Sequence, residues 1–182
     1  MANGNHLYEA TAQALIKYHY KNGTLPKYIL IYRDDVGTSP ENLCNVEFNP
    51  MMGAIQHVYN KTSNNITIPH VTFMTVAKRI TTKIFTNDSS RCDSEISIDN
   101  ASSGTILDIE DGNISRFFLV SQKMVKSTAC PVRISVLRNT TDEVTIEMLQ
   151  LVSYKLTYLY YNTAMISRQP APGMVKKIFF FN

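Results

Sequence analysis

Two adjacent carboxylates, Asp34 and Asp35, stand one residue beyond the end of an apolar run in this chain. The run, residues 29–32, has the continuous hydrophobicity of a strand that is buried on both faces of a sheet. Sites in α/β proteins collect just beyond the ends of such strands, so Asp34 is a candidate active-site carboxylate. The alternative is that the two acids only open a loop and cap the next helix.

The composition is typical of one globular domain with a small positive charge. The 182 residues are 44% hydrophobic, which is enough for a core, and the formal net charge is +3. This charge permits a polyanionic partner, but local clustering of Lys and Arg has to support one. The three cysteines are widely spaced and form no Cys/His cluster, which disfavours both a disulfide framework and a zinc site.

The sequence contains neither the apolar length of a membrane span nor the pattern of a signal peptide. We therefore expect an intracellular protein, cytoplasmic with the nucleus as the alternative, and no membrane partner. Six N-x-S/T tripeptides, the acceptor pattern for glycosylation, favour secretion instead, although loops rich in Asn, Ser and Thr produce them by chance. They begin at Asn60, Asn65, Asn87, Asn100, Asn113 and Asn139.

The first half of the chain predicts helices and strands in alternation. We expect a helix over 7–21, a strand through Ile31, and helix starts at Ser39-Pro40 and Asn49-Pro50. The next strand, 71–76, also ends in charge. Residues 86–103 are rich in Asn, Asp and Ser and predict an exposed polar loop.

The second half predicts three more strands and one long helix. The strands are expected at 104–109, 117–121 and 132–137, with a turn at 111–113 between the first two. Thr140 and Glu143 have the spacing of a capping box at the helix start. The predicted core-facing stripe of that helix is Met148, Val152, Leu156 and Leu159, and we interpret Tyr154, Tyr158, Tyr160 and Tyr161 as packing groups in preference to base-stacking groups. The whole pattern predicts an α/β sheet with at least one open edge.

Five separated segments together resemble the second half of the PIWI domain of Argonaute proteins, and the Piwi branch in particular. They are ILIYRDDVG at 29–37, VTFMTVAKRITTKIF at 71–85, GTILDIE at 104–110, FFLVSQ at 117–122, and YKLTYLYYN with PAP within 154–172. The resemblance implies a ribonuclease H-like α/β fold that holds a small guide RNA and, in active members, cuts a paired RNA with magnesium. Residues 1–182 would then form one partial PIWI domain that lacks the N-terminal strands and the C-terminal tail of the family.

The same resemblance places only one catalytic carboxylate in this chain. Two-metal phosphoryl transfer needs several carboxylates and usually a His around the ions. Asp34 aligns with the family's acid, but the family's Glu falls near Ala2 and its His at Lys177, whose ammonium repels metal ions. Asp35 stands where the family usually has Gly. We expect Asp34 to be a vestigial catalytic residue and a weak metal ligand, no cofactor to be needed, and magnesium to matter only if some cleavage activity remains.

Six basic residues lie in or near the segments that resemble the family. Basic side chains there can neutralise RNA phosphates without reading sequence, although each one alone can equally be a solvated surface cation. One of them, Arg133, replaces a His of the family pattern. The predicted RNA-binding residues are Lys78, Arg79, Lys83, Lys123, Lys126 and Arg133.

Three functional hypotheses follow. The first is a Piwi-like fragment for small-RNA-guided silencing, which binds a guide RNA, and a target RNA paired with it, through the phosphate backbone without slicer activity. The second is a protein-interaction module or decoy without RNA affinity, which docks on a protein partner through a bare sheet edge beside Ile29 and Ile31 or through the apolar tail at 179–181. The third is a magnesium-dependent RNA endonuclease in which other ligands join Asp34 and Asp35.

Overall fold

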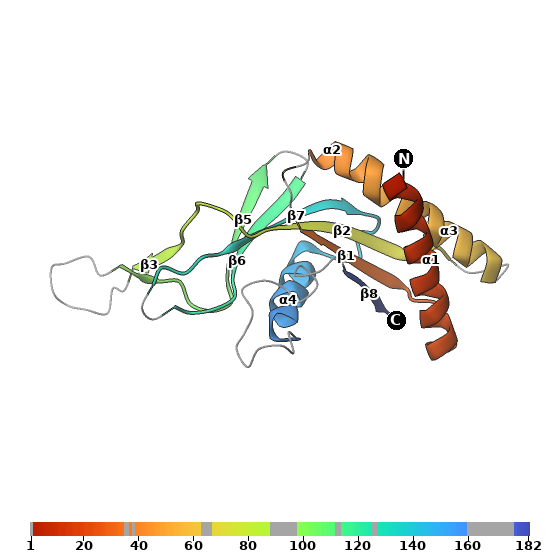
Figure 1. Cartoon of the computed structure of the whole chain (residues 1–182). Helices are drawn as coiled ribbons and strands as arrows, with labels where there is room; N and C mark the ends of the chain where they lie inside the picture. Colours follow the sequence, from red (N-terminus) through yellow and green to blue (C-terminus); the bar gives the residue numbers. More distant parts are fainter. Residues whose placement is uncertain are drawn as a thin grey trace.

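Two parallel strands, β1 (Tyr28–Asp34) and β2 (His70–Ala77), lie inside a six-stranded sheet (Figure 1). The structure is a computed structural model that describes residues 2–34, 37, 39–62, 67–87, 98–111, 114–124, 127–159 and 177–182. The order of the strands is β5-β6-β7-β2-β1-β8, and the other neighbours pair antiparallel. The remaining strands of this sheet are β5 (Thr105–Asp111), β6 (Ile114–Val120), β7 (Val132–Asn139) and β8 (Lys177–Phe181).

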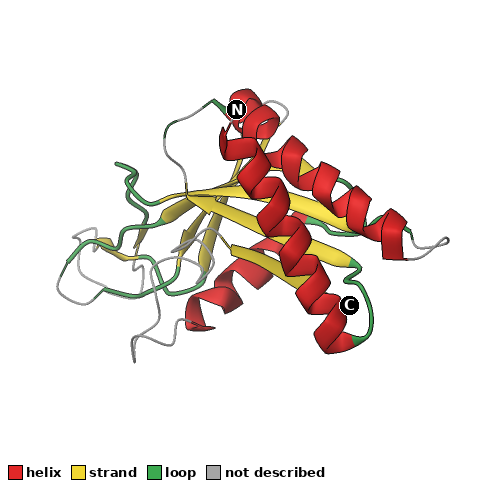
Figure 2. Ribbon diagram, turned by 45° about the vertical axis from the view of Figure 1, so that its right-hand side comes forward, coloured by secondary structure: helices red, strands yellow, loops and turns green. Residues whose placement is uncertain are grey.

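Helices cover both faces of the sheet, so it has two apolar cores (Figure 2). Side chains alternate along a strand. Ile29 and Ile31 therefore enter the core under α1 (Ala2–Asn22) and α3 (Asn49–Thr62). Leu30 and Tyr32 enter the core under α4 (Ile146–Leu156). The prediction that this apolar run is a strand buried on both faces is thus confirmed. Among the described residues, none of the helices combines the length and the apolar character needed to cross a membrane.

The predicted helix start at Asn49-Pro50 is correct for α3, which begins at Asn49, although the chain is already helical before it. α2 (Pro40–Leu43), the π-helical turn η1 (Cys44–Phe48) and α3 follow one another without a break. The predicted start at Ser39-Pro40 is correct, and Ser39 Oγ accepts a hydrogen bond from Asn42 N. A proline inside a helix lacks an N–H and crowds the carbonyl four residues earlier. The wider π-helical turn stands directly before Pro50, where it relieves that conflict.

The predicted capping box of the long helix is wrong, and its predicted apolar stripe is correct at two of four positions. α4 begins later than expected, with Thr145 as the N-cap residue. Val152 and Leu156 pack into the core as predicted, whereas Met148 and Leu159 are exposed and Leu149 is buried. A short 3-10 turn, η2 (Thr157–Leu159), ends the helix. The Thr-x-x-Glu spacing occurred by chance one turn upstream of the real cap.

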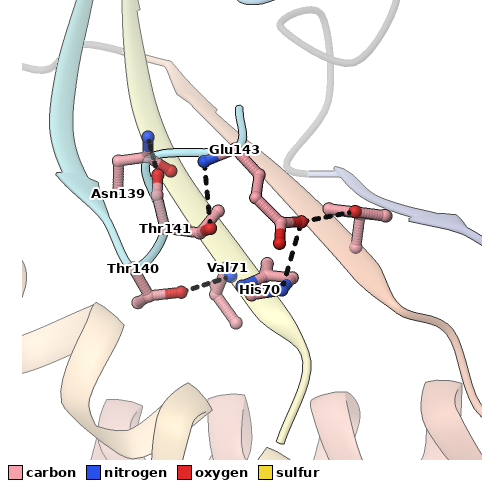
Figure 3. A network of polar contacts seen from close by, with 7 residues as sticks. His70, Val71, Asn139, Thr140, Thr141 and Glu143 are labelled. Carbon is pink, nitrogen blue, oxygen red and sulfur yellow. Dashed lines mark hydrogen bonds and ion pairs between the residues drawn. The ribbon is translucent and has the colours of Figure 1, made fainter. Parts of the chain in front are cut away.

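Thr140 and Glu143 instead fasten the segment before α4 to the sheet (Figure 3). Thr140 Oγ1 accepts a hydrogen bond from Val71 N at 2.8 Å. Glu143 accepts one from the Tyr28 hydroxyl at 2.8 Å and lies 3.7 Å from His70 Nε2. The hydrogen bond to Glu143, followed by its negative charge, raises the pKa of Tyr28. These contacts hold the β7–α4 connection against the starts of β1 and β2.

Replacing Thr145 with Ala is expected to lower the free energy of unfolding by about 1 kcal/mol, because Met148 N would lose its capping acceptor. Thr145→Ser should restore most of the loss, since Ser caps helices equally well. Urea denaturation followed by circular dichroism measures both variants. An unchanged midpoint in Thr145→Ala would contradict this assignment of the cap.

The predicted exposed loop at 86–103 contains secondary structure at both ends. β3 (Phe85–Asn87) and β4 (Ile98–Asn100) pair antiparallel as a separate two-stranded sheet, and residues 88–97 lie outside the described residues. Exposure is confirmed for β3, but Ala101 is fully buried. Asn100 explains the difference, because its side chain bonds Met124 O, Ser127 O and Ala129 N and so ties the hairpin to the chain after β6.

The sheet edge beside Ile29 and Ile31, which the sequence predicts to be bare, is covered. β8 pairs antiparallel with β1 and places Phe180 opposite Ile29 and Ile178 opposite Ile31. Alternate residues of this apolar tail pack into the two cores, with Phe180 in one and Phe179 in the other. The prediction failed because the pairing joins segments almost 150 residues apart, which local patterns do not report.

Candidate nucleic-acid interface

Most of the predicted site residues lie at one end of the sheet, where strands end or begin. This end, and not the outer side of β1 or β5, is the edge meant below. β1, β2 and β6 end at this edge, whereas β5, β7 and β8, which run antiparallel to their neighbours, begin there. Asp34 is the last residue of β1, Lys78 directly follows β2, and Arg133 on β7 lies opposite Ala77 of β2. Lys177 is the first residue of β8 and pairs with Tyr32 of β1. The parallel pair β1–β2 thus brings the acidic and basic candidates of two separate motifs together.

The predicted catalytic carboxylate and a predicted phosphate ligand form an ion pair at this edge. Lys78 Nζ lies 3.0 Å from Asp34 Oδ2 and donates a hydrogen bond to it. The Lys78 and Asp34 side chains are 33% and 42% exposed. The pair is therefore accessible from solvent.

Beside this pair lies a more buried ion pair that the sequence did not predict. Arg33 Nε and Nη2 donate to the two carboxylate oxygens of Glu47 at 2.7 and 3.0 Å, and both side chains are almost 90% buried. Arg33 also donates to the backbone oxygen of Asp34 at 2.6 Å. These bonds fix the end of β1 to η1, and Arg33 and Glu47 line a pocket of about 470 Å³ under α1. The spacing of Arg33 and Glu47 in the sequence carries no signal of the contact.

The other predicted cations do not gather at one point. Arg79 is exposed directly after Lys78, and Arg133 is half-buried. Lys83 donates to Cys130 Sγ at 2.8 Å, while Lys123 Nζ lies 3.7 Å from Asp99 of β4. These two lysines lie along the segments that lead to and face the β3–β4 hairpin. Lys126 falls outside the described residues.

Two tyrosines of α4 and η2 meet the same edge of the sheet. The Tyr154 hydroxyl lies 3.2 Å from Ser103 Oγ, just before β5, and 2.5 Å from the Tyr158 hydroxyl. The hydrogen bonds to Ser103 and then to Tyr158 lower the pKa of Tyr154. Gly104 has φ +87°, and an added Cβ there would lie 3.3 Å from the Tyr154 ring. Tyr154 packs against the core, as predicted, whereas Tyr158 is exposed. Tyr160 and Tyr161 lie outside the described residues.

The described residues do not fit a magnesium site. No group of three His, Cys, Asp or Glu side chains lies together in the part of the chain that the structure describes. Asp34 already faces an ammonium, and the nearby carboxylate of Glu47 is held by both ends of a guanidinium. Magnesium needs several oxygen ligands, and these carboxylates would first have to leave their cations.

The Asn amides of two N-x-S/T tripeptides are occupied by the fold. Asn100 Nδ2, the atom that a glycan would modify, donates to two backbone carbonyls. Asn139 Nδ2 likewise donates to Thr141 O and Val144 O at 2.7 and 2.9 Å. At these two positions the Asn side chain stabilises the fold through hydrogen bonds to the backbone.

Together, a mixed sheet flanked by helices and an acidic strand end beside basic residues define an α/β protein with a candidate site at the ends of its parallel strands. The Piwi domain family model matches residues 3–177, and the chain belongs to this family.

Curated relatives support this assignment. The chain is 34% identical over 171 residues to Piwi-like protein 1 of Schmidtea mediterranea and 37% identical over 160 residues to Protein argonaute-3 of Drosophila melanogaster. Each match covers 87% of this chain but only 19% and 17% of those proteins, so the chain spans less than a fifth of their length.

Solved structures confirm the predicted fold class. Drosophila Piwi superposes with a TM-score of 0.73 at 26% identity, covering 93% of this chain and 22% of that chain. The C-terminal lobe of a budding yeast Argonaute gives a TM-score of 0.74 at 21% identity, covering 91% of this chain and 34% of that chain. The chain therefore has the ribonuclease H-like fold of a PIWI domain and corresponds to part of those structures.

Proposed function

We propose that this chain is the part of a Piwi-type small-RNA-guided silencing protein that binds RNA through the phosphate backbone, without slicer activity. The observation that carries the proposal is the basic edge of the sheet, where Lys78 and Arg79 directly follow β2 and Arg133 lies on the neighbouring strand β7. Family membership agrees with it, and one structure of the same fold, Kluyveromyces polysporus Argonaute, was solved with a guide RNA (TM-score 0.65, 22% identity, 88% of this chain and 20% of that chain covered).

The absence of slicing in this proposal follows from the charge balance around Asp34. Its carboxylate faces Lys78, and the neighbouring Glu47 is held by Arg33. The cationic side chains of Lys and Arg can neutralise a phosphate, but they do not activate a water molecule as a metal ion does. Binding without cleavage is the function that such a site can perform.

The test is the salt dependence of binding to a 5′-phosphorylated single-stranded RNA. The double variant Arg79→Gln/Lys83→Gln should bind about tenfold more weakly at low salt, and the slope of log K against log salt should shrink by roughly 0.7 for each phosphate that the variant no longer neutralises. Fluorescence anisotropy over a salt series measures both quantities.

Lys17→Gln/Lys61→Gln is the matched control, since it removes the same charge from exposed positions on α1 and α3. This control should bind RNA as the wild type does. An equal loss in both double variants, or no affinity of the wild type at low salt, would contradict the proposal and favour a protein-interaction module.

A further inference from the structure

The Asp34–Lys78 pair is a direct consequence of the parallel register of β1 and β2. Asp34 lies opposite Val76, so Lys78 follows two residues further along the neighbouring strand. Its side chain reaches back to Asp34 Oδ2 at 3.0 Å. Both side chains are partly exposed, and ion pairs of this kind contribute little to stability. The pair therefore bears mainly on how available the Lys78 ammonium is to other anions.

A carboxylate and a phosphodiester offer an ammonium the same kind of partner, namely anionic oxygens at hydrogen-bond distance. An RNA phosphate that approaches Lys78 has to replace Asp34 or share the ammonium with it.

The other basic residues of the site provide an internal comparison. Lys83 faces the thiol of Cys130, and Arg79 is exposed beside Lys78. Lys123 faces Asp99 at the longer distance of 3.7 Å. Lys78 is held by the carboxylate of Asp34 at 3.0 Å, the shorter of these two ion pairs.

We propose that Asp34 acts as an internal phosphate mimic that occupies Lys78 and has to be displaced before an RNA phosphate binds there. Asp34 thus lowers the affinity for RNA and raises the RNA concentration at which Lys78 binds the RNA phosphate backbone. This role rests on the proposed RNA binding.

A double-mutant cycle tests the role. Asp34→Asn keeps the shape of the side chain and removes its charge, and it should tighten binding of a 5′-phosphorylated single-stranded RNA about fivefold at low salt. In the Lys78→Met background the same substitution should change the affinity less than twofold. Asp34→Ser, a second variant without the charge, should repeat the pattern. Equal tightening in both backgrounds, or weaker binding of Asp34→Asn, would overturn the proposal.

A measurement without RNA separates this role from the proposed function. Acylation of lysine amines, followed by mass spectrometry, should modify Lys78 faster in Asp34→Asn than in the wild type, because the ion pair protects the amine. Lys83 should react equally in both proteins. An unchanged rate at Lys78 would disprove the pairing itself. A faster rate at Lys78 without RNA affinity in any variant would leave the pairing intact and reject the RNA-binding function, and with it the competition.

Discussion

Replacing Glu47 with Ala is expected to lower the free energy of unfolding by about 3–5 kcal/mol, because it leaves a nearly buried guanidinium without its carboxylate. Arg33 and Glu47 are 11% and 12% exposed, and their contact is bidentate. Arg33 also holds the backbone oxygen of Asp34, so the loss should loosen the end of β1. Urea denaturation at neutral pH measures the change.

Three further variants show whether the unpaired charge causes this loss. Glu47→Gln keeps an acceptor for Arg33 and should cost less than Glu47→Ala. The double variant Arg33→Met/Glu47→Leu removes both charges and should be more stable than Glu47→Ala, since apolar residues replace buried ion pairs at little cost. Glu9→Ala, at an exposed position of α1, should change stability by less than about 0.5 kcal/mol. A double variant no more stable than Glu47→Ala would show that the charge is not the cause.

The sequence predicted the elements that depend on local patterns. The apolar run ending at Asp34 became β1 because continuous hydrophobicity suits a strand with a core on each face. β5 and β6 pair antiparallel on either side of the predicted turn at 111–113; Asp111 is the last residue of β5, and residues 112–113 lie outside the described residues. The acceptor at Ser39 and the fixed φ of Pro40 likewise marked a real helix start. These signals need no knowledge of distant residues.

Features that depend on distant contacts were missed or misplaced. The partner of β1 on its outer side is β8, and the partner of Arg33 is Glu47 on η1. The predicted cap of α4 failed because Thr140 and Glu143 bond to Val71 and Tyr28, which come from other elements. Local spacing cannot separate a cap from a tertiary contact that uses the same residue types.

Two of the predicted site residues contact each other in the structure, and this contact bears on the role of both. Asp34 and Lys78 both lie at the expected edge of the sheet, on neighbouring strands. Considered separately, one predicts a metal ligand and the other a phosphate ligand. At 3.0 Å the ammonium and the carboxylate satisfy each other, and the proposed competition between Asp34 and an RNA phosphate rests on this contact.

Raising the pH from 8 to above 12 is expected to remove about 3 kcal/mol of stability through Tyr32 alone. Its ring is 1% exposed, and burial raises the pKa of its hydroxyl from 10.0 to about 12, although the hydrogen bond to Ser153 at 2.9 Å opposes part of the shift. The folded state favours the neutral phenol. Its contribution is therefore complete below pH 10 and is lost as the pH rises through 12. Burial raises the pKa of Tyr59 as well, so its contribution has the same sign.

Comparing the wild type with Tyr32→Phe isolates this effect from other groups that titrate in alkali. At pH 8 the variant should be less stable by about 1 kcal/mol, because it loses the hydrogen bond to Ser153. Between pH 8 and pH 11 the wild type should lose about 1.4 kcal/mol more than the variant, since Phe has no proton to release. Tyr20→Phe, at a side chain that is 92% exposed, should follow the wild type at both pH values. An equal fall in the wild type and Tyr32→Phe would mean that the buried phenol does not titrate with unfolding, and the alkaline limit of the fold would then lie with other groups.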